Sequence, residues 1–305
     1  MKSAIVTGAG GFIGGALVEK LLAQGVCVVA VDIDKQKLIR RFQHPNINFV
    51  QASFDDYSHI DELIHCSADV FYHFAWQGVF GESFKNYELQ LNNAKYSCMA
   101  LEAATKLRCK KFVFSATNNE FEIKKYLLTD EEIKPRYTCI YSTSKLAAEM
   151  ICKTLACQQG IQYSAGMIAM AFGEKNHSQM LPNVLIRQLL NKHSPPLVNG
   201  HNLYDMIYID DIAEAFYRIG ESGKNMKSYY VGHRKLKTFR EIITEIRDVL
   251  APEVELRFGE YPDNLDMDYS LVDLDALYND TGFECKANFR ESILKTAEWI
   301  KENAG

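Results

Sequence analysis

The sequence has no surplus of basic residues and no long apolar run. Its 34 lysines and arginines stand against 39 aspartates and glutamates, which gives a net charge of −5. Nucleic-acid binders usually carry a basic excess, so we expect no nucleic-acid partner. No run reaches the roughly 18 apolar residues of a membrane span, and the short stretch Ala4–Val6 is no signal peptide. We therefore expect a cytoplasmic protein without membrane contacts.

Cysteine pairs at metal-binding spacing are missing as well. None of the eight cysteines forms a Cys-x-x-Cys motif, and the closest pair is Cys152 and Cys157. Structural zinc sites need such closely spaced pairs. We therefore expect free thiols and no metal site. Low-complexity linkers and internal repeats are also absent, so any two lobes should pack closely.

Short apolar segments alternate with helical patterns through the first half of the chain. Such alternation predicts an α/β fold with a doubly wound parallel sheet. The expected strands are Lys2–Thr7, Val26–Val31, Ile47–Gln51, Val70–Phe74, Lys111–Ser115 and Gln162–Ala169. The expected helices between them are Gly11–Gln24, His59–His65, Tyr87–Leu107 and Ile140–Gln158.

The pattern changes after about residue 170. Helical periodicity dominates there, with short strand-like pieces between the helices. We predict a dinucleotide-binding domain over residues 1–165 and a smaller substrate lobe over residues 166–305, rather than more of the same sheet. The boundary is approximate, and we expect segments of the two parts to interleave. The helices expected in this lobe are Leu181–Asn191, Asp211–Glu221, Thr238–Leu250 and Phe289–Asn303.

A glycine-rich loop follows the first expected strand. Gly8, Gly11 and Gly14 form GxxGxxG, which lets backbone N–H groups approach a pyrophosphate at a helix N-terminus. Asp32 ends the second strand, where a carboxylate binds ribose hydroxyls and repels a 2′-phosphate. This favours NAD over NADP. A purely structural turn is the alternative for the loop, and Asp34 is the alternative acid.

Tyr141 and Lys145 are four residues apart at the start of a helical pattern. Residues at this spacing share one helix face. The ammonium could lower the pKa of the phenol and let it act as a general base or acid. The spacing alone also fits an ordinary solvated helix face.

Together these motifs resemble the extended short-chain dehydrogenase/reductase family, in its NAD-dependent sugar-nucleotide epimerase/dehydratase branch. The resemblance runs along nearly the whole chain and implies a Rossmann-type doubly wound parallel sheet with a smaller C-terminal α/β substrate lobe. The motifs that carry it are Thr7–Gly14, His73–Ala75, Asn93 with Leu101–Ala104, Lys111–Thr117, Tyr141–Lys145 and Tyr208–Ala213.

The resemblance also implies roles for individual residues. Tyr141 would take the proton of a sugar hydroxyl, Thr117 would hydrogen-bond that oxygen, and Lys145 would hold the nicotinamide ribose. The implied cofactor contacts are Gly8, Gly11, Phe12, Ile13, Gly14, Asp32, Ser53, Phe54, Phe74, Ala75, Asn93, Ser115, Tyr141 and Lys145. The implied substrate contacts are Trp76, Asn118, Met170, Arg187 and Tyr204.

Several positions depart from the family pattern. Ser53 replaces an Asp that contacts adenine, Met170 replaces an Asn, and Tyr204 replaces an Arg that grips the substrate pyrophosphate. The C-terminal Arg-x-Gly-Asp element is not evident around Tyr261–Asp266. Either the substrate lacks a pyrophosphate, or other basic groups bind it, the candidates being Arg187, Lys192, His193, His201 and Arg257.

The expected function is an NAD-dependent oxidoreductase or epimerase acting on a sugar hydroxyl, with a nucleotide sugar as partner and a homodimer as a possible assembly. Asn118 and Asn119 follow Thr117, where the family's 4,6-dehydratases carry Asp-Glu, so we expect no dehydratase. We expect Glu120 to point away from Asn119. The alternatives are a reductase of a non-sugar carbonyl and a non-catalytic dinucleotide-binding module. Cys139 is the reserve acid/base.

Overall fold

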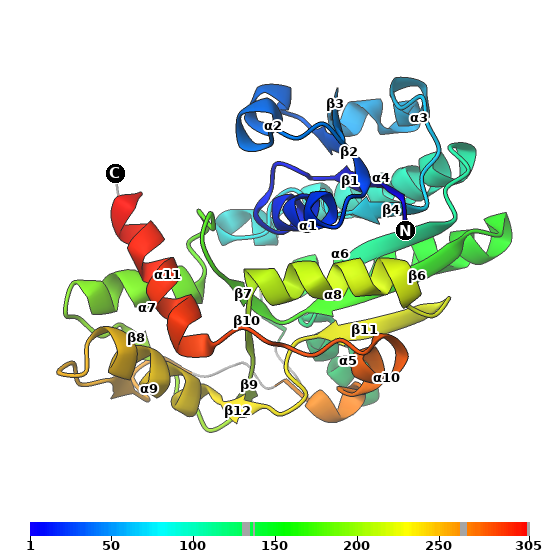
Figure 1. Ribbon diagram of the computed structural model, residues 1–305. Coiled ribbons are helices and arrows are strands. Elements are labelled where there is room, and N and C mark those ends of the chain that lie inside the picture. The colour runs from blue at the N-terminus through cyan, green and yellow to red at the C-terminus, as the bar shows by residue number, and fades with distance from the viewer. Residues whose placement is uncertain (130–134, 137, 263–266, 304–305) are drawn as a thin grey trace.

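The centre of the protein is a seven-stranded sheet in the order β11-β6-β5-β4-β1-β2-β3. The computed structural model describes residues 1–129, 135–136, 138–262 and 267–303 (Figure 1). All six strand pairings in the sheet are parallel, which confirms the predicted doubly wound fold. The strands are β1 (Ser3–Thr7), β2 (Cys27–Asp32), β3 (Ile47–Gln51), β4 (Val70–His73), β5 (Lys111–Thr117), β6 (Gln162–Ile168) and β11 (Lys227–Val231).

Helices cover both faces of this sheet, so its strands are apolar on both sides. Every residue of β5 is buried. Two helix pairs form the layers, α1 with α8 and α4 with α6 (Figure 1). The helices of this part are α1 (Phe12–Ala23), α2 (Lys35–Arg41), α3 (Ile60–Leu63), α4 (Tyr87–Lys106), α5 (Glu120–Leu128), α6 (Cys139–Gln159), α8 (Ile209–Ser222) and α10 (Ala276–Thr281).

The smaller C-terminal lobe lies at one end of the sheet, where Figure 1 shows α7, α9 and α11 together. Its α9 begins with a capping box, in which Thr238 and Glu241 each accept a backbone N–H of the other residue. The helices are α7 (Leu181–Leu190), α9 (Phe239–Leu250) and α11 (Phe289–Glu302). The short strand pairs are β7 (Met170–Phe172) with β10 (Met206–Tyr208), β8 (Pro196–Leu197) with β13 (Arg257–Phe258), and β9 (Leu203–Tyr204) with β12 (Lys237–Thr238).

The expectation that the chain after residue 170 is not more of the same sheet is wrong for one strand. Strand β11 pairs with β6 at the sheet edge, and α8 packs on α1. The polar residues Lys227 and Ser228 open β11, so its apolar run was too short to stand out. Among the described residues, no helix is both long enough and apolar enough to cross a membrane.

Candidate active site

A cavity of about 710 Å3 lies at the carboxyl ends of the central strands, where parallel sheets bind their ligands. The glycine loop, the end of β5 and the start of α6 all line it. A second cavity of about 260 Å3 extends from it toward the end of β2. The two cavities form one elongated site, because they share six lining residues: Gly8, Gly10, Gly11, Lys37, Phe74 and Trp76.

The glycine loop has the close packing that a dinucleotide cradle requires. Gly8 has a φ of 69°, and a Cβ there would lie 2.7 Å from the backbone nitrogen of Ala75. A Cβ on Gly14 would collide with the carbonyl oxygen of Gly8. Asp32 accepts the N–H of Gly10 at 2.8 Å, which braces the loop against the end of β2. Asp34 instead caps α2 by accepting the N–H of Lys37.

Three predicted catalytic residues meet in the larger cavity. The Lys145 ammonium donates to the carbonyl of Ser115 at 2.8 Å and lies 3.9 Å from the centre of the Trp76 ring. The Tyr141 phenol lies close enough to the Thr117 side chain for Thr117 to lower its pKa. Tyr141, Thr117 and Lys145 are 9%, 8% and 4% exposed, so water is largely kept from all three.

Burial dominates the charge state of these groups. It raises the pKa of the Tyr141 phenol, and the Thr117 side chain opposes that rise. Burial lowers the pKa of Lys145 to about 7. We expected the Lys145 charge to lower the pKa of Tyr141, whereas in this structure the group that lowers it is Thr117.

Most of the predicted cofactor residues line one of the two cavities. Asn93 does not, because its buried amide pairs with both backbone groups of Gln77, at 3.0 and 2.8 Å, and so shapes the loop behind Trp76. The lining residues among the predicted set are Gly8, Gly11, Phe12, Ile13, Gly14, Asp32, Ser53, Phe54, Phe74, Ala75, Ser115, Tyr141 and Lys145.

The predicted substrate residues divide into two groups. Trp76, Asn118 and Met170 line the larger cavity. Arg187 and Tyr204 do not line either cavity. The Arg187 guanidinium bonds the Gln179 side chain at 3.1 Å, and Tyr204 is buried edge-on against a phenylalanine of α9.

The other candidate phosphate-binding cations also lie outside the cavities. Lys192 pairs with Glu253, and Arg257 pairs with Glu260. His193 and His201 are exposed and do not line the site. Of the segment Tyr261–Asp266, where an Arg-x-Gly-Asp element is not evident, residues 263–266 lie outside the described residues.

Sequence reasoning named Lys37 only as a possible ligand of a 2′-phosphate and missed the other basic side chains that line the larger cavity. They lie in α2 and in the loop after β7, where no motif marked them. Arg41 donates to the Gly11 carbonyl at 2.9 Å, and Glu19 pairs with both Arg41 and Lys175. The set is Lys37, Arg40, Arg41, Lys175 and His177.

The segment after Thr117 differs from the expected extension. Helix α5 starts at Glu120, so Asn118 and Asn119 line the cavity while Glu120 is completely buried outside it. Cys139 is buried and lines neither cavity. Within the described ranges, no group of His, Cys, Asp or Glu could hold a metal ion.

Comparisons with known proteins agree with this architecture. The sequence model of the NAD dependent epimerase/dehydratase family matches residues 4–232. A trifunctional UDP-glucose 4,6-dehydratase/UDP-4-keto-6-deoxy-D-glucose 3,5-epimerase/UDP-4-keto-L-rhamnose-reductase of Arabidopsis thaliana is 26% identical over 99% of this chain. The chain spans about half of that relative, 47% of its length. The dTDP-D-glucose 4,6-dehydratase of Bos taurus is 24% identical, with 99% of this chain and 89% of the bovine protein covered.

Solved structures share the fold along the whole chain. UDP-glucose 4-epimerase of Thermotoga maritima has a TM-score of 0.79 at 21% identity, covering 99% of this chain and 100% of that one. The dTDP-glucose 4,6-dehydratase DesIV of Streptomyces venezuelae, solved with NAD, has a TM-score of 0.80 at 20% identity, covering 99% and 98%. Because the family model extends from the first strand through β11, the chain belongs to the NAD dependent epimerase/dehydratase family of enzymes, whose cofactor is NAD.

Proposed function

We propose that this enzyme oxidises and reduces a single carbon of a nucleotide sugar, as an epimerase or a 4-ketoreductase. The observation that carries the proposal is the meeting of Thr117, Tyr141 and Lys145 at one end of the cavity. Their types match an acid/base group, its hydrogen-bonding partner and a cation that orients a ribose. A non-catalytic module would have no use for this buried arrangement.

NAD, when bound, supplies the hydride acceptor and donor. Tyr141 takes the proton of the reacting hydroxyl and returns it when the carbonyl is reduced. Thr117 hydrogen-bonds the same oxygen and stabilises the charge that develops on the phenol. Lys145, fixed by the Ser115 carbonyl, holds the nicotinamide ribose. The rings of Trp76 and Phe84 pack edge-on against Tyr141 and exclude water from it.

Elimination of water is not part of the proposed reaction. A 4,6-dehydration needs an acid and a base beside the catalytic Thr, and the cavity presents the carboxamides of Asn118 and Asn119 there. Carboxamides do not exchange protons near neutral pH. Glu120 does not line the cavity and is 0% exposed. These features favour epimerisation or ketoreduction over dehydration.

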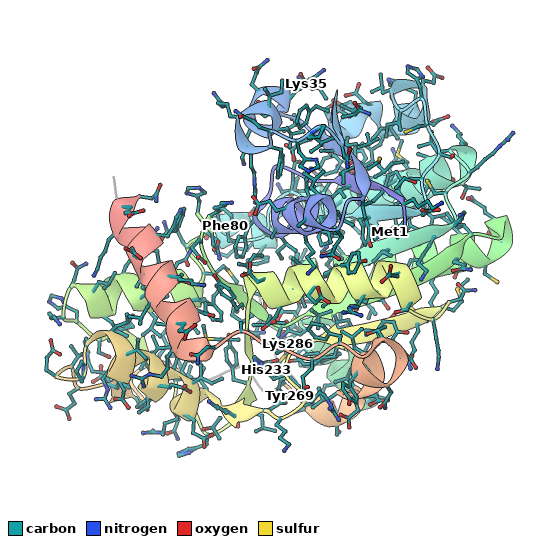
Figure 2. All side chains as sticks on the ribbon, in the orientation of Figure 1. Met1, Lys35, Phe80, His233, Tyr269 and Lys286 are labelled. Atoms are coloured by element: carbon teal, nitrogen blue, oxygen red, sulfur yellow. The ribbon has the colours of Figure 1, made fainter. Side chains whose placement is uncertain are left out.

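One feature favours a second candidate, the reduction of a non-sugar carbonyl. One wall of the larger cavity is apolar, and Val79 and Phe80 line the cavity while 39% and 46% exposed (Phe80 is labelled in Figure 2). Met170 and Met180 complete this wall. Such a surface suits an apolar substrate. Arg187 and Tyr204 lie outside both cavities, so neither can bind the phosphates of a nucleotide sugar there.

A thermal-shift screen with UDP-, dTDP-, GDP- and CDP-sugars in the presence of NAD tests the proposal. A ligand at 100 times its Kd adds about 2.7 kcal/mol of apparent stability. NADH accumulation from the stabilising sugar would indicate net oxidation, whereas isomer formation without NADH would indicate an epimerase. Stabilisation by NAD alone, with none of the sugars adding to it, would favour the non-sugar substrate.

The possible homodimer is tested separately, by sedimentation velocity of the purified protein.

A further inference from the structure

Two buried carboxyl groups that the proposed reaction does not use lie close to the catalytic residues. Glu120 opens α5 and is 0% exposed, and Glu149 on α6 is 3% exposed. Glu149 follows Lys145 by four residues, so both belong to the same face of α6. Ionised carboxylates are rarely buried without a cation or a full set of hydrogen bonds, so these two require a physical explanation.

Each carboxyl has one oxygen with a donor and one without. Glu120 Oε1 accepts the backbone N–H of Thr117 at 3.2 Å, and Glu149 Oε1 accepts the hydroxyl of Ser228 at 2.5 Å. The Oε2 atoms of both residues are buried and have no protein donor in the described part of the chain. Burial raises the pKa of Glu120 well above its usual value and the charge of Glu149 raises it further, so the two carboxyls lie close enough to interact. One proton between them would satisfy both oxygens.

Several groups surround the pair. On α5, Lys124 acts on Glu120. On α6, the charges of Glu120 and Glu149 act on Lys145, and the charge of Glu149 acts on Cys152. The charge of Glu120 also adds to the raised pKa of Tyr141. On β6, Tyr163 is buried and its hydroxyl has no hydrogen-bond partner among the described residues; burial raises its pKa, and the charges of both carboxyls raise it further.

Lys145 has no carboxylate within ion-pair distance among the described residues. Its ammonium contacts the Ser115 carbonyl and the faces of Trp76 and Phe114. The charges of Glu120 and Glu149 both raise its pKa against the effect of burial. A buried cation without a nearby anion is costly, so its charge must be balanced from further away.

We propose that Glu120 and Glu149 share one proton and that the single negative charge left on the pair balances the ammonium of Lys145. With one proton, the pair and Lys145 are neutral together; with none they carry one negative charge, and with two they carry one positive charge. Through its bond to the Thr117 N–H, Glu120 is also a positioning residue for the proposed chemistry. This catalytic consequence rests on the proposed function, but the sharing of the proton does not.

Isosteric amide substitutions give this proposal a distinctive signature. Glu120→Gln or Glu149→Gln removes the shared proton and leaves one carboxylate, so the negative charge is retained. The double variant Glu120→Gln/Glu149→Gln removes the charge. We expect each single variant to move the titration midpoint of Lys145 by less than about 0.3 pH units and the double variant to lower it by about one unit or more.

The midpoint is measured by 13C NMR of the lysine Cε groups in the cofactor-free protein, with Lys145→Arg identifying the signal. Equal and additive shifts in the two single variants would mean that both carboxyls are ionised. No shift in any variant would mean that both are neutral. Either outcome overturns the proposal, and neither depends on the substrate. Glu122→Gln, a buried carboxyl of α5 that pairs with Arg136, is the control and should leave Lys145 unchanged.

Infrared spectroscopy tests the same claim without the double variant, should that variant fail to fold. The wild-type protein at neutral pH should show the C=O band of one buried protonated carboxyl in this pair. Each single variant should lose that band, because the remaining carboxyl is ionised. A band that persists in either single variant contradicts the sharing. In the pH profile of turnover, the inflection that belongs to Lys145 should keep its wild-type pH in the single variants, whatever their turnover, and should move to lower pH in the double variant.

Discussion

At the scale of the residue, burial sets the chemistry of this site. Burial raises the pKa of Tyr141 and lowers that of Lys145 to about 7, so it works against the charged form of each group before any ligand arrives. The sequence identified the residues from their spacing and motif context. The sequence could not show that Thr117 is the residue that opposes the rise in the pKa of Tyr141. Thr117 is on β5 and Tyr141 is on α6, so their approach depends on tertiary packing.

Replacement of the Tyr141 hydroxyl should remove catalysis and leave cofactor binding largely intact. Tyr141→Phe keeps the ring packing against Phe84 and Trp76 but loses the proton-transfer group. We expect turnover to fall by about 100-fold or more, with the Kd for NAD nearly unchanged in calorimetric titration. Tyr217→Phe, a half-buried position on α8 that lines neither cavity, is the control. Near wild-type turnover in Tyr141→Phe would place the acid/base elsewhere.

The low pKa of Lys145 should make stability depend on pH in a defined window. The folded protein holds this group at a pKa of about 7, against an ordinary value of 10.5. Between these values the unfolded chain binds more protons than the folded one, so the contribution of Lys145 to stability rises with pH. From pH 7 to 10, we expect the free energy of unfolding of the wild type to rise relative to that of Lys145→Met. A flat difference in denaturant unfolding across that range would refute this.

At the scale of the element, sequence patterns were sufficient where a strand or helix carries its own signal. The buried strands, the glycine loop and the long helix α6 were predicted close to their observed bounds. The short, charged helix α2 and the start of α5 were missed, because neither has a long apolar stripe. Arg187 and Tyr204 were expected at the substrate, but the packing of the small lobe decides where their side chains lie.

The contact between the end of β2 and the glycine loop should determine cofactor choice. Asp32 lines the smaller cavity and faces the loop through Gly10, so a 2′-phosphate there would meet a carboxylate. We expect NAD to bind more tightly than NADP in calorimetric titration. Asp32→Asn should reduce the difference in affinity between NAD and NADP. Equal or tighter binding of NADP by the wild type would contradict the prediction and would point to Lys37, which lines both cavities.

The loop after β7 should supply the phosphate contact that Arg187 does not. Lys175 lines the larger cavity and is 51% exposed, with Glu19 as its partner. We expect Lys175→Ala to weaken binding of a sugar nucleotide about tenfold, which is about 1.4 kcal/mol. Arg187→Ala should leave the affinity unchanged, because Arg187 lies outside the cavity. The reverse ranking would restore Arg187 as the phosphate ligand.

At the scale of the whole molecule, the site is built from distant parts of the chain. The glycine loop and β2 form one end of the elongated cavity, and residues from Ile168 to Met180 close the other. Glu19 of α1 joins these parts, since it pairs with Arg41 on one side and Lys175 on the other. In the proposed reaction, the cofactor and the reacting carbon therefore meet at Tyr141, in a site that only the folded molecule assembles.

The central claim is that this site moves a hydride and a proton at one carbon and eliminates nothing. Mass spectrometry of products after incubation with NAD and dTDP-glucose, UDP-N-acetylglucosamine, GDP-mannose or CDP-glucose tests it most directly, with Tyr141→Phe as the inactive control. We predict a product of unchanged mass for an epimerase, or a change of only two hydrogens for a redox reaction. A product lighter by one water that depends on Tyr141 would contradict the account.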